Sequence, residues 1–393
     1  MSYQPIENYG IIGDLQTVAL VGMDGSIDFM AFPSFDSPTI FAALLDDKKG
    51  GRFQLSPVLP KAKQKQLYLP DSNVLLTRFL AEEGVAEISD YMPIGSINPT
   101  RDLVRRVKTV KGELHYRMVF EPRFDYGRGL HRVEQKEHEV LFIHEGHGEG
   151  CLRLRSEIPV RLVEGAAVAE FVLNAGETAA FLLEEAQPGK ESPSSDPDYV
   201  PNSFKQTLNF WRNWISQSNY QGRWREMVNR AALTLKLLVS QPHGSIVAAP
   251  TFALPELVGG VRNWDYRYTW IRDASFTLYA LIRLGYTGEA EAFMRWMEAR
   301  CEELEPDGSL KVLYRIDGKT PTQEEILDHL EGYCQTSPVR IGNNAFGQLQ
   351  LDIYGELMDS VYLYDKFGQP ISHDFWSNLT RLVDWVCENW VGM

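Results

Sequence analysis

The residue types best suited to chemistry gather between positions 259 and 273. This stretch holds two Trp, two Tyr, three Arg and two Asp within fifteen residues. Flat aromatic faces stack on the C–H face of a pyranose ring, and neighbouring Arg and Asp side chains offer fixed hydrogen-bond donors and acceptors to its hydroxyl groups. The stretch therefore predicts a sugar-binding site.

A purely structural interpretation of the same residues stays open. Asp273 could act only as the N-cap of the helix that follows it. Arg272 and Asp265 could form a buried ion pair, and the aromatic side chains could belong to the core. Composition alone does not choose between the two interpretations.

A second polar stretch covers residues 338–348 and continues into residues 352–356. It is typical of a loop that enters a helix, with Asn343 or Asn344 as the N-cap. Capping and packing account for most of it. Arg340 is the residue that this structural interpretation explains least.

Other chemistries find little support in the sequence. It contains no Gly-x-Ser-x-Gly elbow, P-loop or dinucleotide fingerprint. His144-Glu145-Gly146-His147 is more typical of an exposed turn than of a metal site. The four cysteines lie far apart with no CxxC pair, so we expect free thiols and no metal site.

Charge and hydropathy exclude several partners. The chain has 39 basic and 53 acidic residues, a formal net charge of −14. The acidic residues are spread along the chain, which favours solubility and an uncharged substrate and argues against nucleic acid or an anionic membrane as partner. The first residues lack a secretory signal, and no apolar run reaches the roughly 18 residues of a membrane span. We expect a cytoplasmic protein.

The first half of the chain must supply a β-structure. Short apolar and β-branched runs recur between turn signals, and Asp24-Gly25, Glu83-Gly84 and Lys111-Gly112 each predict a hairpin. About ten such strands indicate an antiparallel sandwich. Residues 187–203, with four prolines, indicate a linker or a domain-edge loop.

After this linker the apolar period changes to that of helices. Helices are predicted over 204–216 and 276–284, among others, and the two loops at 241–273 and 304–343, which carry most of the polar stretches, are longer than packing requires. For the helix after position 223, the predicted buried face consists of Trp224, Met227, Val228, Ala231, Leu235, Leu238 and Val239.

In the motifs given below, the chain resembles glycoside hydrolase family 15, in its bacterial glucoamylase and trehalase-like branch. The strongest match is RNWDYRYTWIRDA at 262–274. Further matches are IENYGIIGD at 6–14, DGSID at 24–28, FDSP at 35–38, HLEGY at 329–333 and PVRIGN at 338–343. Cys334-Gln335 departs from the basic residue and glycine of the family pattern.

The resemblance implies an α+β multidomain protein. Its parts would be an N-terminal antiparallel β-sandwich over residues 1–200, a helical linker over 201–222 and the first part of an (α/α)6 barrel over 223–393. It also implies inverting hydrolysis of terminal α-glucosidic bonds, as in glucoamylases, α-glucosidases and trehalases. The partner is then an α-glucoside or an oligosaccharide.

The family pattern also implies the substrate-binding residues. An Arg-Asp pair at the position of Arg272-Asp273 holds the non-reducing glucose in the innermost subsite, and Trp270 packs beside this sugar. Trp264 and Asp265 shape the pocket, and Arg340 faces its acceptor side. The implied set is Trp264, Asp265, Trp270, Arg272, Asp273 and Arg340.

Catalysis by inversion needs a general acid and a general base, about 6.5–9.5 Å apart. In the family both glutamates follow the helix that here contains Asp384, so we expect them beyond Met393. About five helices follow the linker, fewer than half of a closed barrel. We therefore expect a C-terminally truncated enzyme that is inactive alone.

The last predicted helix supports this expectation. Its apolar stripe has no downstream partner and predicts aggregation or pairing with another chain, including a second copy. The alternative is a non-catalytic sugar-binding or regulatory relative with the same fold. The stripe consists of Leu379, Leu382, Val383, Val386 and Trp390.

Overall fold

The computed structural model describes residues 3–94, 101–146, 150–186 and 192–390. They fall into two compact units. The first unit comprises Met1–Ile215 together with the short segment Leu330–Gln335. The second comprises Ser216–His329 and Thr336–Met393.

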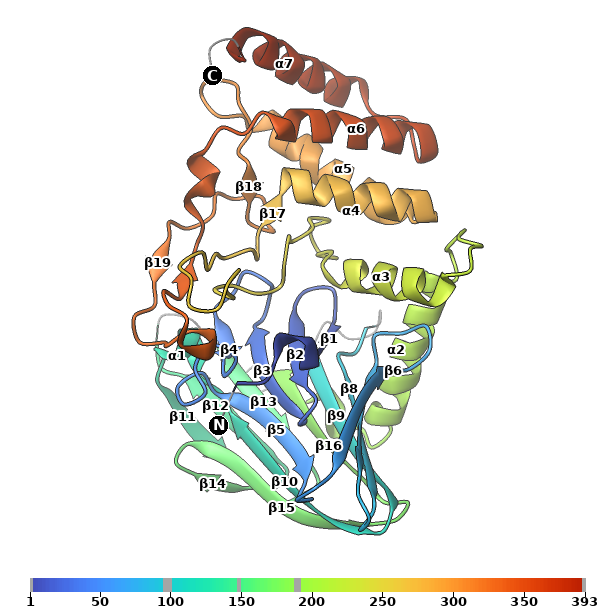
Figure 1. The fold of residues 1–393 in the computed structure, drawn as a ribbon, viewed down its shortest axis with the longest axis vertical. Helices are drawn as coiled ribbons and strands as arrows, with labels where there is room; N and C mark the ends of the chain where they lie inside the picture. Colours follow the sequence, from blue (N-terminus) through green and yellow to red (C-terminus); the bar gives the residue numbers. More distant parts are fainter. Residues whose placement is uncertain (1–2, 95–100, 147–149, 187–191, 391–393) are drawn as a thin grey trace. The chain divides into compact units, whose positions relative to one another are not determined.

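The first unit is built from two antiparallel sheets that face each other (Figure 1). One sheet has the order β1-β2-β3-β5-β10-β15-β14, with β4 on β3, and the other has the order β11-β12-β13-β16-β9-β8-β7-β6. The first sheet contains β1 (Tyr9–Gly13), β2 (Val18–Gly22), β3 (Ser26–Ala31), β4 (Thr39–Phe41), β5 (Arg52–Pro57), β10 (Glu113–Glu121), β14 (Arg161–Val163) and β15 (Ala166–Asn174). The second contains β6 (Lys63–Tyr68), β7 (Leu75–Leu80), β8 (Val85–Tyr91), β9 (Asp102–Lys111), β11 (His131–Gln135), β12 (Glu139–His144), β13 (Cys151–Arg155) and β16 (Thr178–Glu185).

Alternation along the strands explains why the two sheets pack. On β10, Leu114, Tyr116, Met118 and Phe120 are buried, while the side chains between them are mostly exposed. They join one apolar cluster with residues of the second sheet, such as Phe181. The antiparallel sandwich predicted from the sequence is confirmed.

The hairpin predictions have different outcomes. Asp24-Gly25 joins β2 to β3, and Glu83-Gly84 joins β7 to β8, as expected. The hairpin predicted at Lys111-Gly112 is wrong, because β9 pairs with β8 and β16 while β10 pairs with β5 and β15. Gly112 has φ 86°, and a Cβ atom on it would lie 2.3 Å from the Glu83 carbonyl oxygen. Gly112 therefore lets the chain cross from one sheet to the other beside the β7–β8 turn.

Arg105 on β9 is fully buried in the sandwich and pairs with Asp90, also fully buried, at 2.8 Å from Nε to Oδ1. The guanidinium group donates as well to the carbonyl oxygens of Phe53 and Gly25, which belong to the first sheet and its turn. Both charges of this pair are therefore hydrogen-bonded, and the Arg105 side chain links the two sheets.

Replacing Arg105 by alanine leaves the Asp90 carboxylate buried without its partner. We expect Arg105→Ala to lower the free energy of unfolding by about 3–5 kcal/mol. Urea unfolding checks this value. The control is Arg117→Ala, because Arg117 lies 3.8 Å from Glu170 with both side chains more than half exposed, and its loss should cost under about 1 kcal/mol. Equal effects of the two variants would contradict the expectation.

Asp14 lies between β1 and β2 and is also buried. Its Oδ1 accepts hydrogen bonds from the backbone N–H groups of Gln16 and Thr17, both at 2.9 Å. Burial nevertheless dominates and raises the pKa of Asp14 to about 6. The folded protein thus binds this proton more tightly than the unfolded chain does, so stability falls as pH rises from about 4 to 6.

Asp14→Asn keeps the accepting oxygen and removes the ionisation. We expect the variant to lose less stability than the parent between pH 4 and pH 7, by up to about 3 kcal/mol. Urea unfolding at a series of pH values measures this difference. The exposed carboxylate of Glu82 provides the control, and Glu82→Gln should follow the parent curve. A parallel curve for Asp14→Asn would refute the assignment.

The helix α2 (Tyr199–Ile215) covers part of the outer face of the second sheet. Phe204 packs edge-on against Tyr91 with ring centroids 5.4 Å apart, and the Tyr91 hydroxyl donates to the Val200 carbonyl oxygen at 3.1 Å. The segment Leu330–Gln335 joins this unit through Tyr333, whose hydroxyl donates to the Gln4 carbonyl oxygen at 3.0 Å. The sequence did not predict that association.

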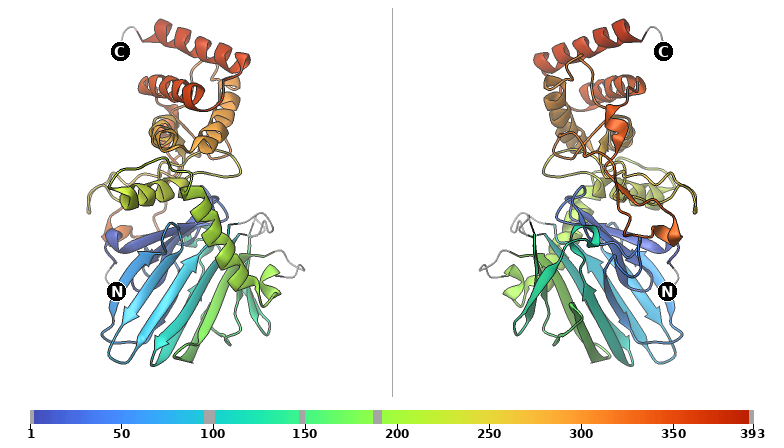
Figure 2. Two further views of the ribbon diagram at one scale, coloured as in Figure 1. Left: turned by 90° about the vertical axis from the view of Figure 1, so that its right-hand side faces the viewer. Right: turned by 90° about the vertical axis from the view of Figure 1, so that its left-hand side faces the viewer.

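The second unit is helical. Figure 2 shows its helices from two sides. Helix α4 packs against α5 and α6, and α7 packs against α5 and α6. Gly285, with φ 99°, ends α4, and α5 begins two residues later, so the two helices form an αα-hairpin. The helices of its described residues are α3 (Arg225–Leu237), α4 (Ile271–Leu284), α5 (Thr287–Glu302), α6 (Asp352–Phe367) and α7 (His373–Asn389).

Two predictions about helix faces need correction. Trp224 and Met227 are exposed, and α3 instead buries Leu233 and Leu237 together with Lys236. A lysine was not expected inside, but its Nζ lies 2.8 Å from the buried Glu289 carboxylate on α5. Because this ion pair allows Lys236 to be buried, α3 packs through a different face from the one that apolar periodicity predicts.

The prediction of an uncovered apolar stripe on α7 was only partly correct. Leu379 and Leu382 are buried in the cluster that α4, α5 and α6 also form. Val383 and Trp390 are exposed, at 43% and 62%. In the motif at 144–147, His144 stacks on Phe124 with ring centroids 5.2 Å apart. His147 lies outside the described residues. No helix in the described ranges is long and apolar enough to span a membrane.

Candidate functional site

The strand β17 (Thr269–Trp270) brings the aromatic stretch to the start of α4. It pairs with β18 (Leu313–Tyr314), and α4 begins at the next residue, Ile271. Trp270 therefore occupies the N-cap position, while Arg272 and Asp273 lie in the first turn. The interpretation of Asp273 as the N-cap is wrong.

A buried carboxylate connects the two long loops. Asp265 is fully buried, and its oxygens accept from Arg267 Nε at 2.9 Å, from Arg267 Nη2 at 2.7 Å and from the Gly342 amide at 3.2 Å. Asn343 Nδ2 donates to the Asp265 carbonyl oxygen at 3.0 Å. The ion pair considered between Asp265 and Arg272 is therefore wrong, because Arg267 takes this place. Asp265 therefore joins the two loops, and its side chain is fully buried.

Arg272 is the centre of the candidate site. Its Nη1 donates to Gln350 Oε1 at 2.9 Å and to Asp352 Oδ2 at 2.8 Å, and its Nη2 lies 3.6 Å from Asp273 Oδ2. The guanidinium carbon also lies 5.7 Å from the centre of the Trp270 ring. The hydrogen bond to Asp352 is the main reason why the pKa of Arg272 is raised. One cation thus stands between two carboxylates and an indole.

Two polar atoms of this group have no hydrogen-bond partner among the described residues. Asp273 Oδ2 and Trp270 Nε1 are both buried at the atom level, although the Asp273 side chain as a whole is 45% exposed. Burial raises the pKa of Asp273, and the neighbouring Arg272 opposes that effect. An unmet acceptor and an unmet donor beside a guanidinium group are suited to a polyhydroxylated ligand.

Arg340 and Trp264 form a second group. The Arg340 guanidinium lies over the Trp264 ring, 4.7 Å from its centre. Arg340 Nη1 also donates to the Val261 carbonyl oxygen at 2.7 Å. The residue sits on β20 (Arg340–Ile341), which pairs with β19 (Glu325–Ile326). Five of the six predicted residues therefore fall into two groups, and the sixth, Asp265, holds their loops together.

Gln350 and Asp352 were not among the predicted site residues. They lie 78 and 80 positions from Arg272 in the sequence, yet both hydrogen-bond to it. Asp352 is the first residue of α6, where a carboxylate is ordinarily assigned to the helix dipole. The available signal was its position directly after the second polar stretch.

Sequence comparison identifies the class of protein to which these loops belong. Residues 222–392 match the model of glycosyl hydrolases family 15, and residues 1–153 match the trehalase-like N-terminal domain. The chain therefore belongs to glycosyl hydrolase family 15, and its β-unit contains the trehalase-like N-terminal domain.

Individual relatives agree with this assignment. The chain is 36% identical to Trehalase 1 of Sulfolobus acidocaldarius, covering 97% of this chain and 64% of that protein. It is 33% identical to the trehalase of Thermoplasma volcanium, covering 97% and 60%, and 32% identical to the trehalase of Mycobacterium tuberculosis, covering 99% and 60%. The chain thus spans about three fifths of the length of these relatives.

A solved structure supports the fold. A bacterial glucoamylase complexed with acarbose matches with a TM-score of 0.68 at 12% identity, over 100% of this chain and 59% of that one. The β-sandwich followed by helices that match part of the glucoamylase fold is the predicted fold class, which is confirmed.

The buried pair of Asp265 and Arg267 leads to a testable expectation. Asp265→Asn keeps the volume but leaves Arg267 charged and without its carboxylate, so we expect a loss of about 3–5 kcal/mol in stability and faster amide exchange over residues 322–344. Urea unfolding and hydrogen exchange measure the two effects.

The matched control is Glu256→Gln in the same loop. Glu256 pairs with Arg262 at 2.8 Å, and both side chains are largely exposed, so its replacement should cost under about 1 kcal/mol. If Asp265→Asn behaves like Glu256→Gln, Asp265 does not join the loops.

Proposed function

We propose that this chain supplies the inner glucose subsite of an inverting glycoside hydrolase that acts on terminal α-glucosidic bonds. The observation that carries the proposal is the group of Arg272, Asp273 and Trp270, with its unmet acceptor and unmet donor. Trehalose is the first substrate to consider, because relatives 32–36% identical are named trehalases. Maltose-type ends are the second, by analogy with glucoamylase.

The proposed roles follow from the chemistry of each side chain. The partly exposed Asp273 carboxylate accepts a hydrogen bond from a glucose hydroxyl, and Arg272 donates to another while Asp352 and Gln350 hold it in place. Trp270 contributes an indole face and its N–H group. Trp264 and Arg340 form the acceptor side. No metal or organic cofactor takes part in this proposal.

Bond cleavage requires two further carboxylates with separate duties. Asp273 and Asp352 are poor choices, because both carboxylates are engaged with one guanidinium group, at 3.6 Å and 2.8 Å from Arg272. We propose that the general acid and the general base lie outside residues 1–393, so that this chain binds sugar without hydrolysing it.

A cytoplasmic location stays a prediction.

Calorimetric titration of the 393-residue chain with trehalose and with glucose tests the binding role. We expect saturable binding that Asp273→Asn weakens about 10-fold or more, because an amide replaces a charged acceptor. The control is Asp359→Asn, which makes the same change at an exposed position of α6 and should bind as the parent does. Absence of sugar heat in the parent chain would overturn the proposal.

A glucose-release assay tests the catalytic part. We expect no turnover of trehalose or maltose by the 393-residue chain. Turnover that Asp273→Ala abolishes would show that the acid and base lie within it. If a longer form of the protein also binds trehalose without hydrolysis, the non-catalytic relative becomes the better interpretation.

A further inference from the structure

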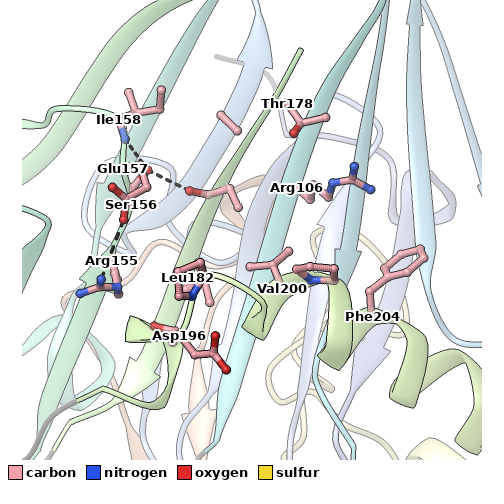
Figure 3. Close-up of a pocket in the computed structure, with 15 residues that line it drawn as sticks. Arg106, Arg155, Ser156, Glu157, Ile158, Thr178, Leu182, Asp196, Val200 and Phe204 are labelled. Carbon is pink, nitrogen blue, oxygen red and sulfur yellow. Dashed lines mark hydrogen bonds and ion pairs between the residues drawn. The ribbon is translucent and has the colours of Figure 1, made fainter. Parts of the chain in front are cut away.

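The first unit contains a cavity that the sugar site does not use. It has a volume of about 480 Å³ and lies between the outer face of the second sheet and the start of α2. This volume falls within the range of small-molecule sites, about 300–1,000 Å³. Figure 3 shows Arg106 and Phe204 toward one end and Arg155, Glu157 and Asp196 toward the other.

Arg106 is the feature of this cavity that needs explanation. It is half-buried on β9, and its side chain makes no hydrogen bond or ion pair with any residue that the structure describes. Nearby arginines differ, because Arg105 on the same strand pairs with Asp90, and Arg101 just before the strand pairs with Glu185 at 2.8 Å. A guanidinium group that is partly removed from water and unpaired attracts an anion.

The remaining charges of the cavity do not neutralise Arg106. Arg155 makes one long ion pair, 3.8 Å to Glu157, and its side chain is 18% exposed against 77% for Glu157. Asp196 is exposed, and its Oδ1 accepts from the Asp198 amide at 2.9 Å. The two cations are thus the less hydrated charges, and both acids lie where water screens them.

Apolar side chains separate the two ends. Leu182 from β16 and Val200 and Phe204 from α2 lie between or beside the charged groups, and Ile158 adds to the wall. These groups offer a surface for a hydrocarbon body but no further charge. The exposed acids at the rim would repel a doubly charged anion more than a singly charged one.

We propose that this cavity binds a small organic carboxylate, with its carboxylate on Arg106 and its apolar body against Leu182, Val200 and Phe204. A planar carboxylate matches the fork of one guanidinium group, and the single unpaired cation matches a single negative charge. The site lies wholly within the β-unit, so the proposal does not depend on the glycosidase assignment.

Calorimetric titration of the 393-residue chain with benzoate provides the test. We expect one saturable site, with binding about 10-fold or more weaker for benzamide, which has the same shape without the charge, and for Arg106→Gln. The control is Lys108→Gln, which removes the same charge two residues further along β9, does not line the cavity and should leave affinity unchanged.

A second measurement on the unaltered chain guards against misfolding of the variant. Benzoate should protect Arg106, but not the exposed Arg117, from modification by phenylglyoxal, as read by mass spectrometry. Equal affinity for benzoate and benzamide, unchanged binding by folded Arg106→Gln, or absence of protection would overturn the proposal. Displacement of benzoate by inorganic phosphate at similar concentration would overturn the assignment to carboxylates.

Discussion

The geometry of the helical unit depends on the buried carboxylate of Asp265. A charge without water must be paired and hydrogen-bonded, and here Arg267 and the Gly342 amide meet that demand from two different loops. Such a pair adds little net stability, but breaking it is costly, so it specifies one loop arrangement more than it strengthens the fold.

The start of α4 is where the residues of the proposed sugar site come together. Arg272 and Asp273 lie in the first turn of α4 with Nη2 3.6 Å from Oδ2, so they present a donor and an acceptor together. Asp352, at the start of α6, holds the guanidinium group from the other side. Asp273 Oδ2 and Trp270 Nε1 are buried there without hydrogen-bond partners among the described residues, which carries an energetic cost.

The sequence predicted local features well and long-range pairings poorly. The Asp24-Gly25 and Glu83-Gly84 turns need only neighbouring residues, and both joined adjacent strands. At Gly112 the same turn chemistry served a change of sheet, which depends on the distant contact with Glu83. Three arginines lay near Asp265, and only the fold selects Arg267. In the same way the sequence predicts an exposed Lys236, and only the packing of α5 brings Glu289 next to it.

Burial and pairing together separate the structural arginines from those available to ligands. Arg105 and Arg267 are both fully buried, and each has a carboxylate within 2.8 Å. Arg272 is partly exposed, and one of the two carboxylates beside it retains an unmet oxygen. Arg106 is half-buried and has no carboxylate among the described residues. Since the cost of an unpaired charge grows with burial, an unpaired arginine persists only where water or a ligand can reach it. The pairing state therefore indicates where this chain can bind other molecules, which composition alone cannot reveal.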